Sequence, residues 1–281
     1  MRALAEFIMR GRMQASAVAM LGYIVPMLTP LVVALVTLRK GAFEGTLLLL
    51  ISLMPGVMSL ALSDSSPLLI WITLVSLIVV FIPALLLRVT VSLSFGIIAA
   101  IAVSVAISGL AMMFASDRID ELIALMFKGL SEQEGGETLA KTMASHTAVS
   151  GIIAYILALN AVFGLLLGRW MQALLYNPGG FAGEFRELRL NAVAAGIFFF
   201  GSVICRVQGS EYWWWSNVLA FPLILVAIAL AHSFAKEKVK QQQASTPWLV
   251  LCYMAVFMIS PLLMLIGFLD TWLNFRSRFI K

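Results

Sequence analysis

Eight mostly apolar runs follow one another along the chain and take up most of its 281 residues. Each run is long enough, or nearly so, to cross a bilayer, because a spanning helix needs about 20 apolar residues. The runs are Met13 to Leu38, Gly45 to Ser63, Ser65 to Leu87, Val89 to Ser116, Thr142 to Gly168, Leu190 to Cys205, Tyr212 to Ala235 and Gln241 to Leu269. The sequence therefore predicts an all-α fold, a polytopic transmembrane helical bundle of eight or nine membrane segments with short amphipathic interfacial helices.

Charged residues are rare in this chain and gather at the ends of the apolar runs. They make up 12% of the sequence, which is about half their share in an ordinary soluble domain. The longest stretch between runs, residues 115–145, is too short to form a hydrophobic core of its own. We predict one integral membrane domain over residues 1–281, with a basic N-terminus (1–12), an amphipathic loop (115–145) and a cytoplasmic interfacial segment (169–190).

The first run, Met13 to Leu38, contains Pro26 and Pro30 and allows two topologies. If it crosses the membrane once, the basic residues on its two sides face opposite compartments, and the overall charge bias almost vanishes. If it breaks at either proline into a hairpin of two short helices, both basic clusters share one side. Proline removes an amide donor and clashes with the preceding turn, so such a break is physically reasonable. We favour the hairpin, which places the N-terminus on the cytoplasmic side by the positive-inside rule.

Two segments between the apolar runs are predicted to form interfacial helices. Asp117 to Leu130 has apolar residues at helical spacing, which predicts an amphipathic helix. Such a helix either caps the bundle or forms a lid over a substrate entrance. Phe181 to Leu190 predicts a second interfacial helix with a densely charged face.

Small residues form a strip along the run from Val89 to Ser116. Gly96, Ala100, Ser104 and Ser108 repeat at every fourth position. Small side chains let helix backbones approach closely in a membrane. The strip therefore predicts that this helix lies in the centre of the bundle.

Polar and aromatic residues within the apolar runs are candidate ligand groups, and each type has a structural alternative. An Asn inside a span either hydrogen-bonds to a neighbouring helix or contacts a substrate. Trp residues at the end of a span form an interfacial belt or an aromatic wall for a ligand. Near the C-terminus, Asp270, Asn274 and Arg278 share a face if the helix continues. The candidate ligand-binding residues are Asn160, Trp213, Trp214, Trp215, Asn217, Asp270 and Asn274.

The sequence has no pattern typical of catalysis or metal binding. His146 and His232 are the only histidines, and neither belongs to an HExxH motif. The stretch from Gly267 to Asp270 lacks the second glycine of the GxGD motif of intramembrane aspartyl proteases, and no other run has a central Asp to pair with it. We predict no catalytic residue, no metal site and no cofactor, and hence a protein that is not an enzyme.

Three motifs in the last hundred residues form a set. They are Glu184-Phe-Arg186-Glu-Leu-Arg189-Leu190, Asn217-Val-Leu-Ala-Phe221-Pro with the stretch to His232, and Gly267-Phe-Leu-Asp270-Thr-Trp-Leu-Asn274-Phe-Arg276. In these motifs the chain resembles the YybS-like family of uncharacterised bacterial membrane proteins. That family looks related to the substrate-binding membrane subunits of energy-coupling-factor transporters, which pass a captured small molecule to a shared ATPase module. This chain has no nucleotide-binding loop, so the resemblance implies that ATP hydrolysis comes from a partner chain.

The resemblance and the predicted bundle imply a multi-pass protein of a bacterial inner membrane that acts as a small-molecule binding or transport subunit. Its expected partners are the lipid bilayer, an unidentified small molecule, and other membrane proteins or an ATPase module. The basic clusters lie beside apolar runs, which favours lipid headgroups and argues against nucleic acid. The alternative function is a membrane assembly or scaffold protein. Residues predicted to face partners are Arg10, Arg12, Glu184, Arg186, Arg189 and Arg276.

Overall fold

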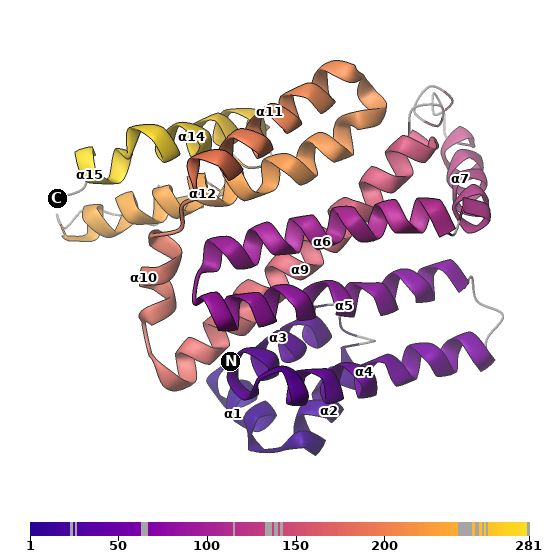
Figure 1. The fold of residues 1–281 in the computed structure, drawn as a ribbon, viewed down its shortest axis with the longest axis horizontal. Helices are drawn as coiled ribbons and strands as arrows, with labels where there is room; N and C mark the ends of the chain where they lie inside the picture. The colour runs from indigo at the N-terminus through magenta and orange to yellow at the C-terminus, as the bar shows by residue number, and fades with distance from the viewer. Residues whose placement is uncertain are drawn as a thin grey trace. The chain divides into compact units, whose positions relative to one another are not determined.

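The computed structural model divides the chain into two compact units, which are described separately (Figure 1). Unit 1 comprises Met1–Phe181 and Ser210–Trp214, and unit 2 comprises Ala182–Gly209 and Trp215–Lys281. The structure describes residues 1–22, 25, 27–62, 67–114, 116–132, 137, 140, 143–240, 249–250, 253–254, 256 and 258–279. Every regular element in that part of the chain is helical, which confirms the predicted all-α fold class.

The described α-helices range from 5 to 31 residues, and two of them pass from one unit into the other. Unit 1 contains α1 (Arg2–Arg10), α2 (Arg12–Leu21), α3 (Leu28–Lys40), α4 (Ala42–Leu62), α5 (Pro67–Thr90), α6 (Leu93–Phe114), α7 (Ser116–Ser131), α9 (His146–Tyr176) and the 3₁₀ turn η1 (Ser210–Tyr212). Unit 2 contains α11 (Ala192–Gln208), α14 (Ser260–Leu273) and α15 (Phe275–Phe279). The helices shared between the units are α10 (Gly180–Arg186) and α12 (Trp213–Lys240).

Four helical segments among the described residues are long and apolar enough to cross a membrane. They are Ala42–Ser59, Leu93–Phe114, His146–Tyr176 and Ser210–Glu237. Shorter apolar helices cover Leu74–Thr90, Ala192–Gln208 and Ser260–Leu273. These helices are consistent with a membrane-embedded protein, but the predicted eight or nine membrane segments are not confirmed. Much of the last predicted run, including residues 241–248, lies outside the described residues.

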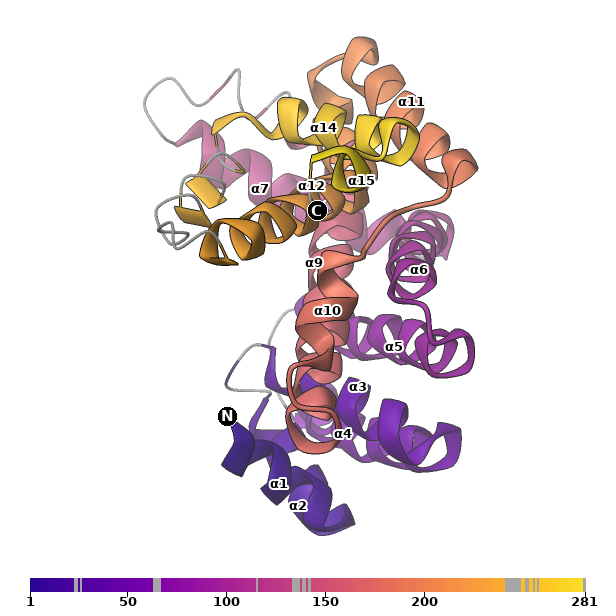
Figure 2. The same cartoon turned by 90° about the vertical axis from the view of Figure 1, so that its left-hand side faces the viewer.

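The centre of unit 1 is α3, and not α6 as the small-residue strip predicted. Every residue from Thr29 to Leu38 is buried, and α3 packs against α2, α4, α5 and α9 (Figures 1 and 2). A helix that is apolar all round is expected to be enclosed by other helices. The close approach of α9 depends on glycine, because a Cβ on Gly168 would lie 2.6 Å from the Cβ of Ala34.

The small-residue strip of α6 serves as a packing face, although α6 is not central. Gly96, Ala100, Ser104 and Ser108 are all buried, and α6 packs against α5 and α9. The Ser108 hydroxyl donates a hydrogen bond to the backbone carbonyl of Ser150 in α9 at 2.7 Å. The prediction of close helix contact along this strip is therefore confirmed.

The first apolar run is interrupted, as the hairpin hypothesis predicted. Helix α2 ends at Leu21 and α3 begins at Leu28, after Met27 in the left-handed conformation with φ 73°. Pro26 lies outside the described residues, and Pro30 lies in the first turn of α3. At the other end of both helices, Arg12 pairs with Glu44, which comes just after the end of α3. The first apolar run therefore turns back on itself, and both of its ends lie at the same end of unit 1.

Basic residues from distant parts of the sequence gather at this same end of unit 1. Arg88 donates from Nη1 to the carbonyl of Leu38 at 2.6 Å. The guanidinium of Arg39 lies over the ring of Tyr176 at 3.9 Å, an arrangement typical of a cation–π contact. Tyr176 is the last residue of α9, so this basic end marks one end of that long helix. The basic residues share one end of unit 1, and its position on the cytoplasmic side of a membrane stays a prediction.

The opposite end of α9 carries the predicted amphipathic helix. Helix α7 spans Ser116–Ser131, which confirms the helix predicted over Asp117 to Leu130. Its Asp120 carboxylate lies 2.9 Å from Nε2 of His146, the first residue of α9. Acidic α7 and the basic cluster are thus at opposite ends of one helix. Residues 169–176, predicted as part of a cytoplasmic interfacial segment, belong to α9 itself.

Cysteine labelling tests the hairpin and the charge polarity of unit 1. In a background without Cys205 and Cys252, we expect Arg10→Cys and Arg39→Cys to react with a membrane-impermeant maleimide from the same side of sealed vesicles. Glu121→Cys on α7 should react from the other side only. Labelling of Arg10→Cys and Arg39→Cys from opposite sides would show that the first run crosses the membrane once.

Candidate functional site

A fully buried carboxylate lies between two guanidinium groups in unit 2. Asp270 near the end of α14 has no exposed surface, and its Oδ2 is 3.3 Å from Nη2 of Arg276. The same oxygen is 3.8 Å from Nε of Arg189. Its Oδ1 accepts a hydrogen bond from the backbone N–H of Phe275 at 3.1 Å. We call Asp270, Arg189 and Arg276 the charged cluster.

Both arginines of the charged cluster also bind backbone carbonyls. Arg189 donates from Nη2 to the carbonyls of Asp270 at 2.8 Å and Thr271 at 3.1 Å. These carbonyls belong to the last turn of α14, where a cation is favoured, and the carbonyl of Asp270 also accepts from the backbone N–H of Asn274 at 3.1 Å. Arg276 donates from Nη2 to the carbonyl of Leu188 at 2.9 Å. The charged cluster therefore ties the segment after α10 to α14 and α15.

The end of α14 differs from the continuous helix that the spacing of Asp270, Asn274 and Arg278 suggested. Helix α14 ends at Leu273, and Asn274 adopts the left-handed conformation with φ 47°. Asn tolerates this conformation better than most residues, which suits it to a helix terminus. The turn brings the backbone of Phe275 to Asp270 and lets Arg276 reach the buried carboxylate. Asp270 and Arg278 consequently do not share one helix face.

The three sequence motifs that begin at Glu184, Asn217 and Gly267 meet in unit 2. Contacts of Arg189 with Asp270 join the first motif to the third. The second motif joins them where the Ser233 hydroxyl, next to His232, donates to the carbonyl of Arg186 at 3.0 Å. Phe185 also lies edge-on to His232, with ring centroids 5.7 Å apart. Residues far apart in sequence thus form one contiguous region.

The second predicted interfacial helix is shorter than the sequence suggested. Helix α10 ends at Arg186, whereas the prediction continued it to Leu190. Leu188 and Leu190 are buried, and the carbonyl of Leu188 is bound by Arg276. The segment after α10 leaves helical geometry because its apolar side chains and carbonyls pack into unit 2.

The residues predicted to face partners differ in their exposure and contacts. Arg189 and Arg276 lie against Asp270, with side chains 31% and 13% exposed. Burial lowers the pKa of the Arg276 guanidinium, and the neighbouring Asp270 carboxylate opposes this shift. Arg10 at the end of α1 is exposed, and Glu184 and Arg186 are half-buried. A partner-facing role for any of these residues stays a prediction.

A second feature of unit 2 is a pocket between α11, α12 and α14, with a volume of about 210 Å³. Its lining residues are Ser202, Val203, Arg206, Val207, Asn217, Ala220, Ser260, Pro261 and Met264. The Ser202 hydroxyl donates to the carbonyl of Ser216 at 2.9 Å, so part of the polar lining is held in place. Arg206 and Asn217 supply a guanidinium and an amide beside a mainly apolar wall. Apolar walls with few polar groups are typical of small-molecule sites.

The predicted ligand groups are not all brought to this pocket. Asn217 lines it, whereas Asp270 and Asn274 lie at the end of α14 and Trp215 is the first residue of the second part of unit 2. Asn160, Trp213 and Trp214 belong to unit 1. There Trp214 lies against Tyr155, with ring centroids 5.5 Å apart.

Asn160 was predicted to bind a ligand but lies outside the pocket, whereas Arg206 was not predicted and lines it. The Oδ1 atom of Asn160 is buried and has no hydrogen-bond partner among the described residues. Its predicted ligand role therefore stays open within unit 1. Arg206 was not among the predicted ligand residues, yet it lines the pocket of unit 2. The sequence signal was a charged residue, Arg206, at the end of an otherwise apolar run.

No protein-family model, curated protein or solved structure matches this chain.

Proposed function

We propose that this protein is a multi-pass membrane protein that binds a small molecule in the pocket of unit 2, as the binding subunit of a transport system. The observation that carries the proposal is the pocket between α11, α12 and α14, in which Arg206 and Asn217 lie beside apolar residues. A guanidinium and an amide can orient a polar group, while the apolar wall favours the remainder of the ligand. Its volume of about 210 Å³ suits a small solute, since pockets for drug-sized ligands measure about 300–1,000 Å³.

The helices that line the pocket also reach the charged cluster, which supports a role in transport. Helix α12 contributes Asn217 to the pocket and the Val226 carbonyl, 3.5 Å from Nη2 of Arg276. Helix α14 contributes Ser260 to the pocket and Asp270 to the charged cluster. A rearrangement of either helix on ligand binding would therefore change both the pocket and the charged cluster. Such a connection suits a subunit whose ligand state must be sensed by partner proteins.

The resemblance to YybS-like proteins extends this proposal to an energised system. The three motifs that carry the resemblance include Asn217 and all members of the charged cluster. A relation to the binding subunits of energy-coupling-factor transporters would assign ATP hydrolysis to a separate module. The chain itself would then capture the solute within the membrane.

Native mass spectrometry of the full-length protein, extracted gently from its own membranes, tests ligand binding. We expect a reproducible small-molecule adduct, and at least about tenfold weaker retention in Asn217→Leu, because an amide that orients the ligand is lost. Gln208→Leu is the matched control, since Gln208 is an exposed amide at the end of α11 outside the pocket lining. Its adduct should be unchanged.

Two results would contradict this assignment. Loss of the adduct in Asn160→Leu with full retention in Asn217→Leu would move the ligand site to unit 1. A ligand-free protein that is recovered with other membrane proteins would favour the assembly or scaffold alternative instead.

A further inference from the structure

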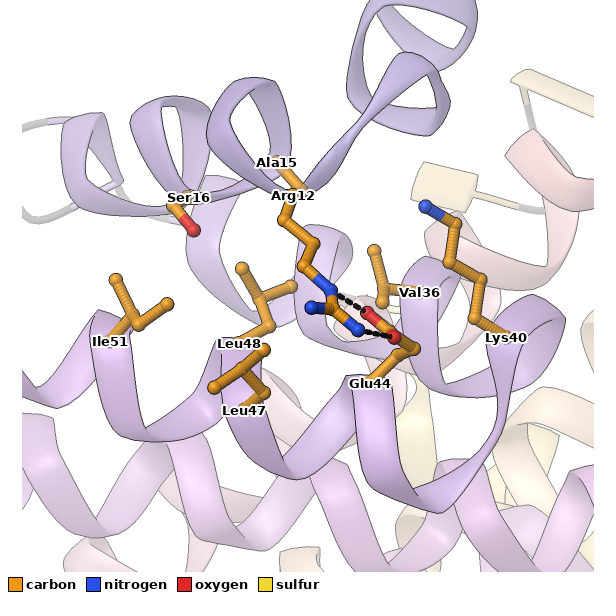
Figure 3. Close-up of a pocket in the computed structure, with 9 residues that line it drawn as sticks. All are labelled: Arg12, Ala15, Ser16, Val36, Lys40, Glu44, Leu47, Leu48 and Ile51. Carbon is orange, nitrogen blue, oxygen red and sulfur yellow. Dashed lines mark hydrogen bonds and ion pairs between the residues drawn. The ribbon is translucent and has the colours of Figure 1, made fainter.

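A notch at the basic end of unit 1 has a polar part around Arg12, Lys40 and Glu44 (Figure 3). Beside it lies an apolar part formed by Leu47, Leu48 and Ile51 of α4, which we call the apolar floor. The notch lies between α2, α3 and α4 and is separate from the pocket of unit 2. Its lining residues are Arg12, Ala15, Ser16, Val36, Lys40, Glu44, Leu47, Leu48 and Ile51.

The polar part of the notch carries a net positive charge. Arg12 donates to Glu44 through Nε at 2.9 Å and through Nη2, so Nη1 takes no part in this ion pair. Hydrogen bonding to Glu44 raises the pKa of Arg12 above its usual value. Lys40 also interacts electrostatically with Glu44. Arg12 and Lys40 together exceed the single carboxylate by one positive charge, and the Ser16 hydroxyl adds a neutral donor.

The apolar floor continues toward the surface of α4 that would face the hydrocarbon. Leu47, Leu48 and Ile51 follow Glu44 along α4 (Figure 3). Further exposed apolar side chains, including Leu50 and Met54, lie on the same helix, whose first 18 residues qualify as a membrane span. Exposed apolar residues of this kind are expected to contact lipid acyl chains.

We propose that one anionic phospholipid binds over the mouth of the notch, with its phosphate against Arg12 and Lys40 and an acyl chain along Leu47 and Ile51. The headgroup lies at the mouth because the space inside the notch is only about 10 Å³. The basic group at the end of a span matches an anionic headgroup, and basic pockets between membrane helices are known to favour such lipids. The adjoining apolar floor distinguishes a lipid from a free phosphate ion. Glu44 holds Arg12 in position, because it engages two of the three guanidinium nitrogens.

Lipid binding to the detergent-purified full-length protein tests this proposal by native mass spectrometry. We expect phosphatidylglycerol to be retained in preference to phosphatidylcholine with the same acyl chains. Lys40→Gln should weaken phosphatidylglycerol binding about fivefold, which is the contribution expected of one basic residue near an anionic headgroup. Lys128→Gln is the charge-matched control, because Lys128 lies on exposed α7 at the other end of unit 1. It should bind like the wild type.

A second variant tests the shape of the notch independently of charge. Ser16→Phe places a large side chain beside Leu47 and Leu48 and should reduce phosphatidylglycerol binding while keeping the net charge. If this variant does not fold, the proposal is tested by phosphatidylglycerol binding to Lys40→Gln compared with Lys128→Gln. Equal binding in those two variants, equal retention of phosphatidylcholine, or displacement of the lipid by an equimolar amount of inorganic phosphate would each overturn the lipid assignment.

Discussion

Asp270→Asn is expected to destabilise the protein by about 3–5 kcal/mol, the usual cost of removing one partner from a buried ion pair. The substitution keeps an oxygen that can accept the hydrogen bond from Phe275, so it removes mainly the charge. Two guanidiniums would then lie side by side at the end of α14 without the intervening carboxylate. Denaturation of the purified protein in a mild detergent, followed by the loss of helical circular dichroism, measures the change.

Asp117→Asn is the matched control for this prediction. Asp117 is exposed in the first turn of α7, and exposed substitutions usually change stability by less than about 0.5 kcal/mol. The double variant Asp270→Asn/Arg276→Gln should recover part of the loss, since it removes one of the two cations together with the carboxylate. If Asp270→Asn were as stable as Asp117→Asn, the charged cluster would not hold α14 and α15 in place.

The predictions that the structure confirms depend on local sequence, although α10 ends before the predicted Leu190 and α14 ends at Leu273. The amphipathic spacing in Asp117 to Leu130 is a property of a single helix, and α7 forms there. The packing face of α6 was likewise visible as a four-residue repeat that includes Gly96 and Ser104, both buried. The interruption of the first apolar run followed from the geometry of proline. In each case the residues of the sequence pattern and the residues of the structural feature lie in one segment of about 30 residues.

Features that depend on distant residues could not be predicted from the sequence. Arg189 and Asp270 were both marked as candidate residues, but their contact spans 81 positions, and they were given different roles. The central position of α3 could not be predicted for the same reason. An apolar run has the same sequence pattern whether its helix lies at the centre of a bundle or at its edge. Arg206 and Ser260 come together only when α11 and α14 pack in unit 2.

Gly267→Ala is expected to destabilise unit 2 by about 3 kcal/mol, the upper end of the usual cost of overpacking a buried contact. A Cβ at this position would lie 2.0 Å from the carbonyl oxygen of Leu223 and 2.8 Å from its carbonyl carbon. Both are backbone atoms of α12, so no side chain can move aside to make room. Helices α12 and α14 would have to separate between the pocket and the charged cluster. Detergent denaturation measures the stability, and the Asn217-dependent adduct should weaken with it.

Gly196→Ala separates this steric effect from the intrinsic effect of replacing a helical glycine. Gly196 lies inside α11, and a Cβ there would meet nothing within 4 Å. Because alanine favours a helix over glycine by about 1 kcal/mol, this control should leave stability unchanged or raise it slightly. The decisive result is that Gly267→Ala lowers the stability of the protein, whereas Gly196→Ala does not. A Gly267→Ala variant as stable as Gly196→Ala would mean that α12 and α14 do not approach through their backbones, and the connection between the pocket and the charged cluster would lose its basis.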